Sequence, residues 1–407
     1  MGEASWLVTF NAGSSSLKVG VFEYREGIRS RIRAAVRDIG RDSATLDTGK
    51  GTEDVGPVMS VEDAARLLLD RLEQGIEETR VDRHDVAATG HRIVHGGDHY
   101  AGAARVDRAA FETLQSLNHL APLHNPPALA VMKVVQERFP EAAIVADFDT
   151  AFFHELPDTA RTYAIPAALA ERHGIRRYGF HGLAHQFMSR QLESLSPDGR
   201  HPERAVTLQL GQGCSVAALR SGRPVETSMG FTPLEGLVMG TRSGDIDAGV
   251  LLYLAQQGYG WDELEDVLNR KSGLLGLSSE SDDVRVLLEA ASAEHPRSRL
   301  ALEVFCHRIL KYLGAYTAVL GGIDAIAFGG GIGENSPSIR TRVCSGLAWL
   351  GVELDEKANA VCTGKRGRIS TDKSIADVHV VPVDEEPVIA AATWHVLRGA
   401  DPDGTTR

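Results

Sequence analysis

The hydrophobic pattern near the start of the chain predicts a β-hairpin, and the same pattern recurs near the middle. Residues 6–10 (WLVTF) form an apolar run, residues 11–16 (NAGSSS) a small polar turn, and residues 17–24 (LKVGVFEY) a second run with alternating faces. Residues 206–220 (VTLQLGQGCSVAALR) repeat this order of β-run, glycine-containing turn and β-run. The repeat predicts an internal duplication in which each domain opens with the same phosphate-facing hairpin.

Helical and strand-like patterns alternate between the two hairpins. Residues 61–78 and 127–138 have apolar positions three and four apart, which is typical of helices. Residues 86–94 (VAATGHRIV) and 142–148 (AAIVADF) are short strand-like runs. This alternation is typical of α/β domains.

A later segment has an order of elements that is suited to nucleotide binding. A long amphipathic pattern over residues 297–322 predicts a core helix that stops at paired glycines. It leads into a predicted strand at 324–328, the glycine-rich turn 329–335 (GGGIGEN), and a helix that begins near Ser336 and Pro337. A strand, a glycine-rich turn and a helix N-terminus turn backbone N–H groups toward a phosphate.

Composition narrows the class of protein and of partner. The 407 residues are 43% hydrophobic and 24% charged, as in a globular chain long enough for two domains. The formal net charge is −12 and no Lys/Arg-rich block occurs, so we expect neither nucleic acid nor an anionic membrane as a partner. The start lacks a secretory pattern, no apolar run reaches the roughly 18 residues of a membrane span, and the cysteines show no paired spacing. We therefore expect a cytoplasmic protein with reduced thiols.

The histidines have spacings that could suggest a metal site. His91, His95 and His99 are four residues apart, but Ile93 and Val94 between them favour a strand over the helix that would align three ligands. Residues 181–185 (HGLAH) have helical spacing without the glutamate of a metalloprotease. These histidines therefore have another role or none.

A different set of residues suggests phosphoryl transfer. Arg92 and Arg242 lie beside glycines, where a guanidinium can bind carboxylate or phosphate through two hydrogen bonds. Asp149, His181 and Lys18 lie in similar small-residue surroundings. Each arginine alone is more often a surface charge, but together with the two hairpins and GGGIGEN they indicate a phosphate site.

Several stretches of the sequence together resemble the acetate kinase (acetokinase) family. They are NAGSSSLK (11–18), GHRIVHGG (90–97), LAPLHNPP (120–127), FDTAF (148–152), YGFHG (178–182), SMGFTPLEGLVMGTRSGDID (228–247) and FGGGIGENS (328–336). They occur in the order of the family, and Glu385 in VDEEPVIA (383–390) completes the set. The resemblance therefore covers nearly the whole chain.

The resemblance implies the acetate and sugar kinase/actin-like ATPase fold, which has two duplicated ribonuclease H-like α/β domains with an active-site cleft between them. We expect residues 1–152 with 387–407 to form the N-terminal domain and residues 153–386 the C-terminal, nucleotide-binding domain. The resemblance also implies a homodimeric enzyme, a phosphotransferase with a carboxyl group as acceptor. The implied reaction is reversible transfer from ATP to acetate, giving acetyl phosphate and ADP, with Mg2+ or alternatively Mn2+.

The resemblance also assigns site residues, position by position. Asn11 and Glu385 would hold the metal, and Arg92 would bind the substrate carboxylate. The residues resembling catalytic ones are Asp149, His181 and Arg242. The pocket for the substrate methyl group would consist of Val94, Leu123, Phe180 and Pro233. The nucleotide would contact Lys18, Gln209, Leu210, Gly211, Gln212, Gly213, Asp283, Val284, Arg285, Gly331, Ile332, Gly333, Glu334 and Asn335.

Elementary chemistry limits what Asp149 can do. A carboxylic acid with a pKa of about 4 to 5 is already an anion at neutral pH, so it needs no general base to attack phosphorus. We therefore expect Asp149 to organise the metal or to orient Arg92. What the reaction needs is charge neutralisation, because an anionic acid must approach an anionic γ-phosphate.

The sequence departs from the family pattern at four positions. Gln209 and Gln212 replace a histidine and an asparagine, Phe153 replaces a histidine, and Pro387 replaces a leucine. Gln209 keeps an N–H donor without an imidazolium charge, which we expect to cost on the order of 1 to 3 kcal/mol in the transition state. Three hypotheses stay open: an acetate kinase with an altered rate, a kinase for propionate or another short acid, and a weakly active or non-catalytic nucleotide-binding relative.

Overall fold

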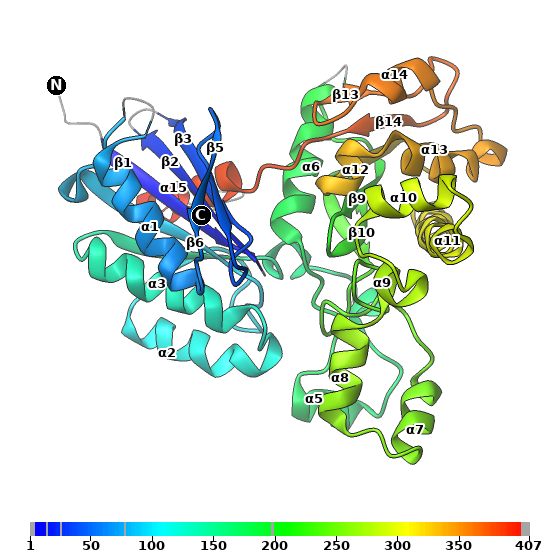
Figure 1. Cartoon of the computed structure of the whole chain (residues 1–407), viewed down its shortest axis with the longest axis horizontal. Helices are drawn as coiled ribbons and strands as arrows, with labels where there is room; N and C mark the ends of the chain where they lie inside the picture. Colours follow the sequence, from blue (N-terminus) through cyan, green and yellow to red (C-terminus); the bar gives the residue numbers. More distant parts are fainter. Residues whose placement is uncertain (1–4, 14, 25–26, 77–78, 197–198, 400–407) are drawn as a thin grey trace. The chain divides into compact units, whose positions relative to one another are not determined.

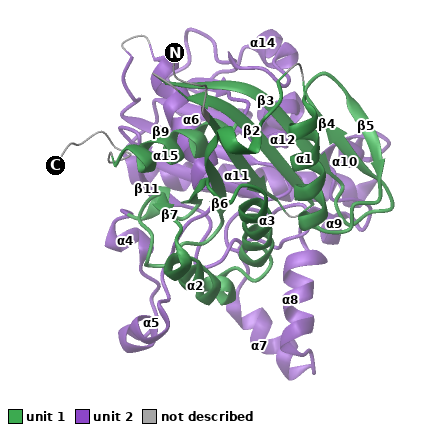
Figure 2. Ribbon diagram, turned by 90° about the vertical axis from the view of Figure 1, so that its left-hand side faces the viewer, with its two compact units in different colours: residues 1–154, 384–407 green, residues 155–383 purple. Residues whose placement is uncertain are grey.

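The computed structural model describes residues 5–13, 15–24, 27–76, 79–196 and 199–399. The chain separates into two compact units, shown in different colours in Figure 2: unit 1 is residues 1–154 with 384–407, and unit 2 is residues 155–383. Ser14 of the first predicted turn lies outside the described residues. In the part of the chain that is described, no helix has both the length and the apolar character needed to cross a membrane.

Unit 1 is built on an eight-stranded sheet with the order β5-β4-β3-β2-β1-β6-β8-β7. Its strands are β1 (Ser5–Ala12), β2 (Ser16–Tyr24), β3 (Ile28–Arg37), β4 (Ala44–Asp47), β5 (Thr52–Gly56), β6 (Val86–Ile93), β7 (Ala104–Arg105) and β8 (Ala143–Phe148). Its helices are α1 (Val61–Gln74), α2 (Arg108–Ser116), α3 (Asn125–Arg138) and α15 (Glu386–Arg398), with 3-10 turns at Arg83–Asp85, Leu117–Leu120 and Ala151–Phe153. Strands β1, β6 and β8 are parallel, whereas β1 to β5 pair antiparallel in sequence order.

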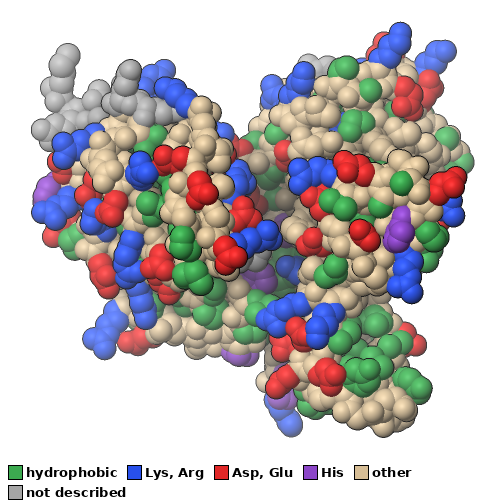
Figure 3. Space-filling model, viewed as in Figure 1, with side chains coloured by type: hydrophobic (Ala, Val, Ile, Leu, Met, Phe, Trp, Pro, Cys, Tyr) green, Lys and Arg blue, Asp and Glu red, His purple; other side chains and the backbone are tan. Residues whose placement is uncertain are grey.

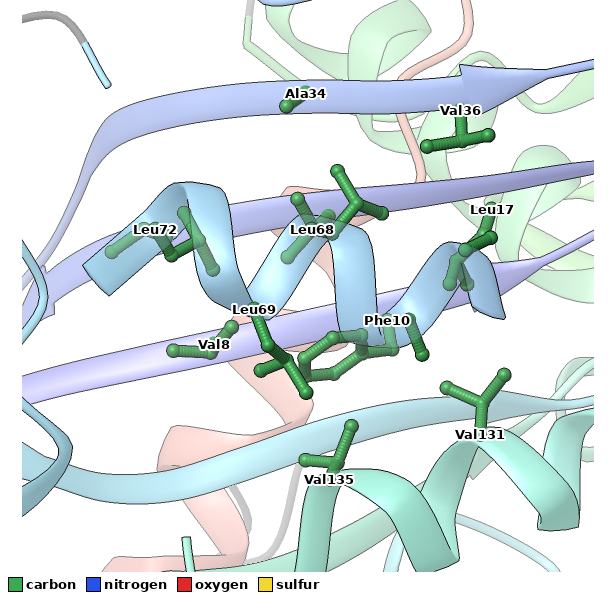
Figure 4. Close-up of a cluster of buried hydrophobic side chains, with 14 of the residues drawn as sticks. Val8, Phe10, Leu17, Ala34, Val36, Leu68, Leu69, Leu72, Val131 and Val135 are labelled. Atoms are coloured by element: carbon green, nitrogen blue, oxygen red, sulfur yellow. The ribbon is translucent and has the colours of Figure 1, made fainter. Parts of the chain in front are cut away.

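Alternating side chains of β1 serve two cores, one on each face of this sheet. Val8 and Phe10 pack with Leu68 and other buried aliphatic residues of α1 and α3 (Figure 4). Leu7, directly before Val8 in the sequence, lies in a second cluster with Ala390 of α15. Helices α1 and α3 therefore cover one face and α15 the other (Figure 1).

Unit 2 is built on a six-stranded sheet with the order β11-β10-β9-β12-β14-β13. Its strands are β9 (Arg204–Leu210), β10 (Cys214–Arg220), β11 (Arg223–Thr227), β12 (Ala325–Gly329), β13 (Gly367–Arg368) and β14 (Asp377–Val380). Its helices are α4 (Asp158–Arg161), α5 (Ala167–His173), α6 (Gly182–Leu195), α7 (Ala248–Gln256), α8 (Trp261–Arg270), α9 (Gly273–Ser278), α10 (Val284–Ser292), α11 (Pro296–Leu320), α12 (Gly330–Asn335), α13 (Pro337–Ser345) and α14 (Glu356–Val361), with a 3-10 turn at Ala348–Leu350. Helices α6 and α11 pack against this sheet (Figure 1).

The two sheets share one topology, which confirms the predicted duplicated α/β fold. The run β3-β2-β1-β6-β8 in unit 1 corresponds to β11-β10-β9-β12-β14 in unit 2. In each run the first three strands are antiparallel and the last two join in parallel. The two predicted hairpins are β1-β2 and β9-β10, and they occupy equivalent places in the two sheets.

Two predicted boundaries were wrong for identifiable reasons. Helix α1 stops at Gln74 rather than residue 78, because Gly75 has a φ of 103° and its N–H closes the last turn on Arg71. Residues 329–335 were predicted to be a turn, but most of them form helix α12. Gly330 has a φ of 74°, so it reverses the chain directly after β12 and leaves the next residues free to coil.

Candidate active site

The candidate residues of unit 1 lie where parallel strands end. Asn11 is near the end of β1, Arg92 is near the end of β6, and Asp149 follows β8 directly. Parallel neighbouring strands end at the same edge of a sheet, so the fold brings these side chains together. Arg92 donates to both carboxylate oxygens of Asp149, from Nε at 3.1 Å and from Nη2 at 2.6 Å, and from Nη1 to Asn11 Oδ1 at 3.0 Å.

The start of α15 adds carboxylates to this group. Asn11 Nδ2 donates to Glu385 Oε2 at 2.6 Å and to Glu386 Oε1 at 3.3 Å. Glu385 also lies 3.6 Å from Nη1 of Arg92, and Lys18 Nζ lies 4.0 Å from Glu386. Both glutamates are buried. The segment therefore supplies two desolvated carboxylates within reach of one asparagine.

Burial and charge set the protonation of this cluster. Burial alone would lower the pKa of Arg92, but the carboxylates of Asp149 and Glu385 outweigh it and raise that pKa above its ordinary value. Burial, followed by the neighbouring Glu386, raises the pKa of Asp384 to about 7, although Arg33 lies 2.5 Å away. Arg92 is therefore a fixed cation in a predominantly acidic group.

The oxygen donors of unit 1 suit a hard divalent cation. Within the described residues, no group of three or more His, Cys, Asp or Glu side chains is arranged to hold a metal by itself. Mg2+, however, commonly takes one or two protein carboxylates and completes its shell with water and substrate phosphates. Glu385, Glu386 and Asn11 offer that kind of donor set.

In unit 2, His181 stands in a strained position between a loop and a helix. It is the N-cap of α6 and has a φ of 57°, a left-handed conformation that is uncommon for non-glycine residues. Its Nδ1 lies 2.9 Å from Ser215 Oγ on β10. A methyl group on Gly213 would be 3.3 Å from His181 Nε2 and 3.6 Å from Arg242 Nη1, so both side chains adjoin the β9-β10 turn.

Arg242 differs from Arg92 because it lacks a carboxylate partner. Its Nη1 donates to the Pro233 carbonyl at 3.0 Å and contacts Met239 Sδ at 3.7 Å. Among the residues that the structure describes, no carboxylate forms an ion pair with it, and burial lowers its pKa. A desolvated guanidinium beside a glycine turn is suited to bind an external anion.

Three segments expected to contact the nucleotide meet within unit 2. Gln209 is the register partner of Gly329, which places the β9-β10 turn beside the start of α12. Gln212 Nε2 donates to Asp282 Oδ2 at 2.7 Å, which links the same turn to the start of α10. There Asp283 is the N-cap and pairs with the exposed Arg285 at 2.6 Å. The turn 209–213 is thus in contact with both other segments.

The residues expected to form the methyl pocket lie in both units. In unit 1, Val94 is buried directly after β6, and Leu123 is 43% exposed. In unit 2, Phe180 is buried next to His181, and Pro233 is partly exposed beside Arg242. One residue of each pair lies near a candidate arginine: Val94 is two residues from Arg92 in the sequence, and the Pro233 carbonyl accepts a hydrogen bond from Arg242.

The structure also shows what surrounds the four residues that depart from the family pattern. The Oε1 atom of Gln209 is buried and, within the described residues, has no hydrogen-bond partner. Gln212 bonds to Asp282, and Phe153 is buried with its ring centroid 5.2 Å from that of Phe152. Pro387 is in the first turn of α15, where a missing N–H costs no helical hydrogen bond.

Some residues of these groups were missed by reasoning from the sequence. Asp384 and Glu386 flank Glu385, and their run of three acids was a usable signal. Ser215 and Asp282 carry no motif, and only the pairing of distant segments shows their contacts.

Comparisons with known proteins show which family the chain is similar to. The family model described as the acetokinase family matches residues 6–391. An acetate kinase from Heliobacterium modesticaldum is 40% identical over 97% of this chain and all of its own length, and one from Chloroherpeton thalassium is 45% identical over 80% of this chain and 78% of its own.

Solved structures show the same likeness. A crystal structure of Porphyromonas gingivalis acetate kinase has a TM-score of 0.86 at 35% identity and covers 97% of this chain and 100% of its own. A propionate kinase from Francisella tularensis also has a TM-score of 0.86, at 32% identity, and covers 96% of this chain and 100% of its own. The chain therefore belongs to the acetokinase family.

Proposed function

We propose that this protein is an acetate kinase that transfers the γ-phosphoryl group of ATP reversibly to acetate. In the forward direction a carboxylate oxygen forms a bond to the γ-phosphorus. The bond from that phosphorus to the β,γ-bridging oxygen breaks, and its electron pair leaves with ADP. The acid is already ionised at neutral pH, so no proton has to move, and the protein's task is positioning and charge neutralisation.

The observation that carries this proposal is that Arg242 has no carboxylate partner among the described residues. Within the described residues it meets only a carbonyl and a sulfur atom as hydrogen-bond acceptors, and it adjoins His181 and the Gly213 turn. An anionic phosphoryl group would supply the missing counter-charge. Charge that develops on that group in the transition state would strengthen the contact further.

Arg92 is suited to bind the carboxylate of the acid. A guanidinium has five N–H donors, and its bonds to Asp149 and Asn11 use three of them. The remaining donors can reach the acid while Asp149 holds the plane of the guanidinium. This supports an orienting role for Asp149 and gives it no proton to transfer.

The same reasoning applies to the metal ion that the reaction needs. Asn11 and Glu385, with Glu386, would hold Mg2+, which would supply further neutralisation of phosphate charge.

We further propose that units 1 and 2 are the two ribonuclease H-like domains and that the enzyme is a cytoplasmic homodimer. The exposed apolar helix α7 supports the dimer.

A second candidate substrate is propionate. The Francisella tularensis propionate kinase has the same TM-score to this chain as the Porphyromonas gingivalis acetate kinase. One methylene group in an apolar pocket changes binding by only about 1 to 3 kcal/mol. We therefore expect acetate to be preferred and propionate to be accepted.

Trapping the acyl phosphate with hydroxylamine tests the proposal. The purified protein is incubated with ATP, Mg2+ and acetate, propionate or butyrate, and the hydroxamate is measured. Acetate should give the highest kcat/KM, and Arg242→Ala should lower it by about 100-fold or more. The control Arg223→Ala removes an arginine that is 85% exposed and should leave the rate unchanged. The absence of product with every acid, in a protein shown to bind ATP, would refute the kinase assignment.

A further inference from the structure

The second histidine of residues 181–185 (HGLAH) has no part in the reaction proposed above, yet both of its ring nitrogens are hydrogen-bonded. His185 is fully buried on α6. Its Nδ1 lies 2.7 Å from Thr207 Oγ1 on β9, and its Nε2 lies 2.8 Å from Ser215 Oγ on β10. Because Ser215 Oγ also lies 2.9 Å from His181 Nδ1, four side chains form one continuous chain of hydrogen bonds.

The number of protons limits how this chain can be arranged. The Ser215 hydroxyl has one hydrogen and two lone pairs, so it can donate to only one of the two histidines. Burial lowers the pKa of His185 to about 3, so this ring is neutral and carries a proton on only one nitrogen. When Ser215 donates to one histidine and accepts from the other, the direction of one bond fixes the direction of the next.

Two arrangements keep all three hydrogen bonds with Ser215 as both donor and acceptor, and only the first gives the hydrogen of each hydroxyl group an acceptor within the chain. In the first, Thr207 donates to His185 Nδ1, His185 Nε2–H donates to Ser215, and Ser215 donates to His181 Nδ1. His181 then carries its proton on Nε2, the nitrogen beside the Gly213 turn. In the second, each of these bonds is reversed, and His181 donates from Nδ1.

Charge decides which arrangements suit a phosphoryl group. A neutral His181 in the second arrangement would turn the lone pair of Nε2 toward an anion, which is repulsive. The first arrangement turns Nε2–H toward it. The second becomes favourable only when His181 is doubly protonated, and then Nε2–H still faces the anion. In both favourable cases His185 keeps both of its hydrogen bonds, although the second leaves the Thr207 hydroxyl hydrogen without an acceptor in the chain.

We propose that His185 and Ser215 are positioning residues that keep a proton on Nε2 of His181, so that this nitrogen always donates to the transferring phosphoryl group. The chain Thr207–His185–Ser215–His181 also lets His181 accept a second proton while all three hydrogen bonds of the chain are kept. The left-handed backbone of His181 is consistent with a side chain held in a required direction. This inference rests on the kinase function proposed above.

Kinetics of matched variants test the role. Ser215→Ala breaks the chain next to His181 and should lower kcat about tenfold, while KM for ATP and acetate stays within about twofold. Thr207→Val removes the far hydroxyl and should lower kcat about threefold, and Thr207→Ser should restore it. Thr227→Val is the matched control, because Thr227 is also fully buried in this sheet but its hydroxyl bonds to the Val216 carbonyl. Equal losses of kcat in Thr207→Val and Thr227→Val would overturn the proposal.

Nitrogen-15 NMR of histidine-labelled protein provides a readout that requires no turnover. The nitrogen-15 signals of His181 are identified by their loss in the variant His181→Gln. Without ligands, neutral His181 should be protonated on Nε2 in the wild type and show mixed tautomers in Ser215→Ala. An unchanged tautomer in that variant would refute the positioning role. If the wild type forms no acyl phosphate but shows this tautomer pattern, the kinase function fails while the hydrogen-bond chain stands. If Ser215→Ala does not fold, the pair Thr207→Val and Thr207→Ser gives the same test.

Discussion

Arg92 and Arg242 look alike in the sequence, but their surroundings are opposite. Arg92 lies among carboxylates that raise its pKa, and Arg242 is desolvated with a lowered pKa. The first is already neutralised by protein groups and is suited to hold a weak anion in a fixed orientation. The second gains most from binding a strong anion. This difference supports the proposal that Arg92 binds the acid and that Arg242 stabilises the phosphoryl group.

Asp149→Asn tests the orienting role of the buried carboxylate. The variant keeps the shape of the side chain but loses the charge-assisted pair with Arg92, so we expect kcat/KM for acetate to fall about 10- to 100-fold, with a raised KM for acetate. Asp158→Asn is the control, since Asp158 pairs with Arg161 within one exposed helical turn. Steady-state kinetics with varied acetate measure the effect. A loss of kcat with unchanged KM for acetate would contradict orientation and favour direct participation in the chemical step.

Gln209→His tests whether the unusual glutamine limits the rate. Gln209 is the register partner of Ser215, and its Oε1 atom lacks a hydrogen-bond partner among the described residues. A histidine could add positive charge near the phosphoryl group, so we expect kcat to rise up to about tenfold with little change in KM for ATP. Gln191→His, at a residue that bonds to Arg366, is the control. An unchanged kcat would show that the imidazole is dispensable here.

For single residues, the sequence motifs identified the candidate site residues but did not identify the side chains that contact them. Arg92 and Asp149 could be selected because they lie beside glycines or other small residues, in stretches that resemble the family. Their pairing depends on β6 and β8 being neighbours, which no local pattern specifies. The link from His181 to Ser215 spans 34 residues and joins a helix cap to a strand, so it became visible only in the folded chain. The roles of these residues stay predictions.

Among the elements of unit 2, Gln212 connects two loops that local patterns treat as separate. Its side chain reaches Asp282 at 2.7 Å, and its carbonyl accepts from the N–H of Gly240 at 3.0 Å. A methyl group on Gly240 would lie 2.2 Å from Gln212 Oε1, so only glycine leaves room for this path. Hydrogen bonds of Gln212 therefore connect the β9-β10 turn to the loop before Arg242 and to the start of α10.

Gln212→Asn tests this connection. Asparagine is one methylene shorter and should lose the bond to Asp282, so we expect KM for ATP to rise about threefold while kcat changes less than twofold. In a double-mutant cycle, Asp282→Ala should add little to Gln212→Asn, because both remove one interaction. ATP affinity is measured by calorimetry and by kinetics. Additive effects would show that the two side chains act independently.

The order of elements was largely predictable, whereas several of their ends were not. The two hairpins and the long helix α11 have strong periodic patterns that tertiary contacts reinforce. Helix α12 was missed because GGGIGEN has a low helix propensity. Its helical conformation depends on the reversal of the chain at Gly330 after a buried strand. Glycine-rich sequence thus marked the place of a predicted phosphate-binding segment without fixing its conformation.

For the whole molecule, two buried histidines make the free energy of unfolding depend on pH. Burial lowers the pKa of His91 to about 3 and that of His185 to about 3, whereas both titrate near 6.5 when unfolded. The folded state therefore binds fewer protons, and this contribution to stability is complete above about pH 6.5 and is lost as the pH falls toward 3.

His91→Phe should remove part of this dependence. The ring of His91 stacks on Phe10 at 5.2 Å, so phenylalanine preserves an aromatic contact without the titrating group. Between pH 7 and pH 5 the wild type should lose about 2 kcal/mol more than the variant in urea unfolding. The exposed His99→Phe variant should keep the wild-type slope. Equal pH slopes for His91→Phe and the wild type would contradict a neutral buried His91.

The proposed homodimer has a specific candidate surface in unit 2. Helix α7 has no buried residue, although its sequence AGVLLYLAQ is almost entirely apolar. Leu252 is 63% exposed, Tyr253 60% and the nearby Trp261 75%, and Figure 3 shows hydrophobic side chains gathered over α7 and α8. An apolar patch of this kind on a stable protein is typical of an interface, and the family resemblance makes a second copy of this chain the expected partner.

Leu252→Glu should therefore shift the protein from dimer to monomer. A charge buried at the centre of an apolar interface costs several kcal/mol, so dissociation should occur at concentrations about 100-fold or more above that of the wild type. Sedimentation velocity over a dilution series measures this shift. Met59→Glu is the matched control, because Met59 is 67% exposed in unit 1 and should leave assembly unchanged. A wild type that sediments as a monomer, or a Leu252→Glu variant that remains dimeric at the same concentrations, would exclude α7 as the dimer interface.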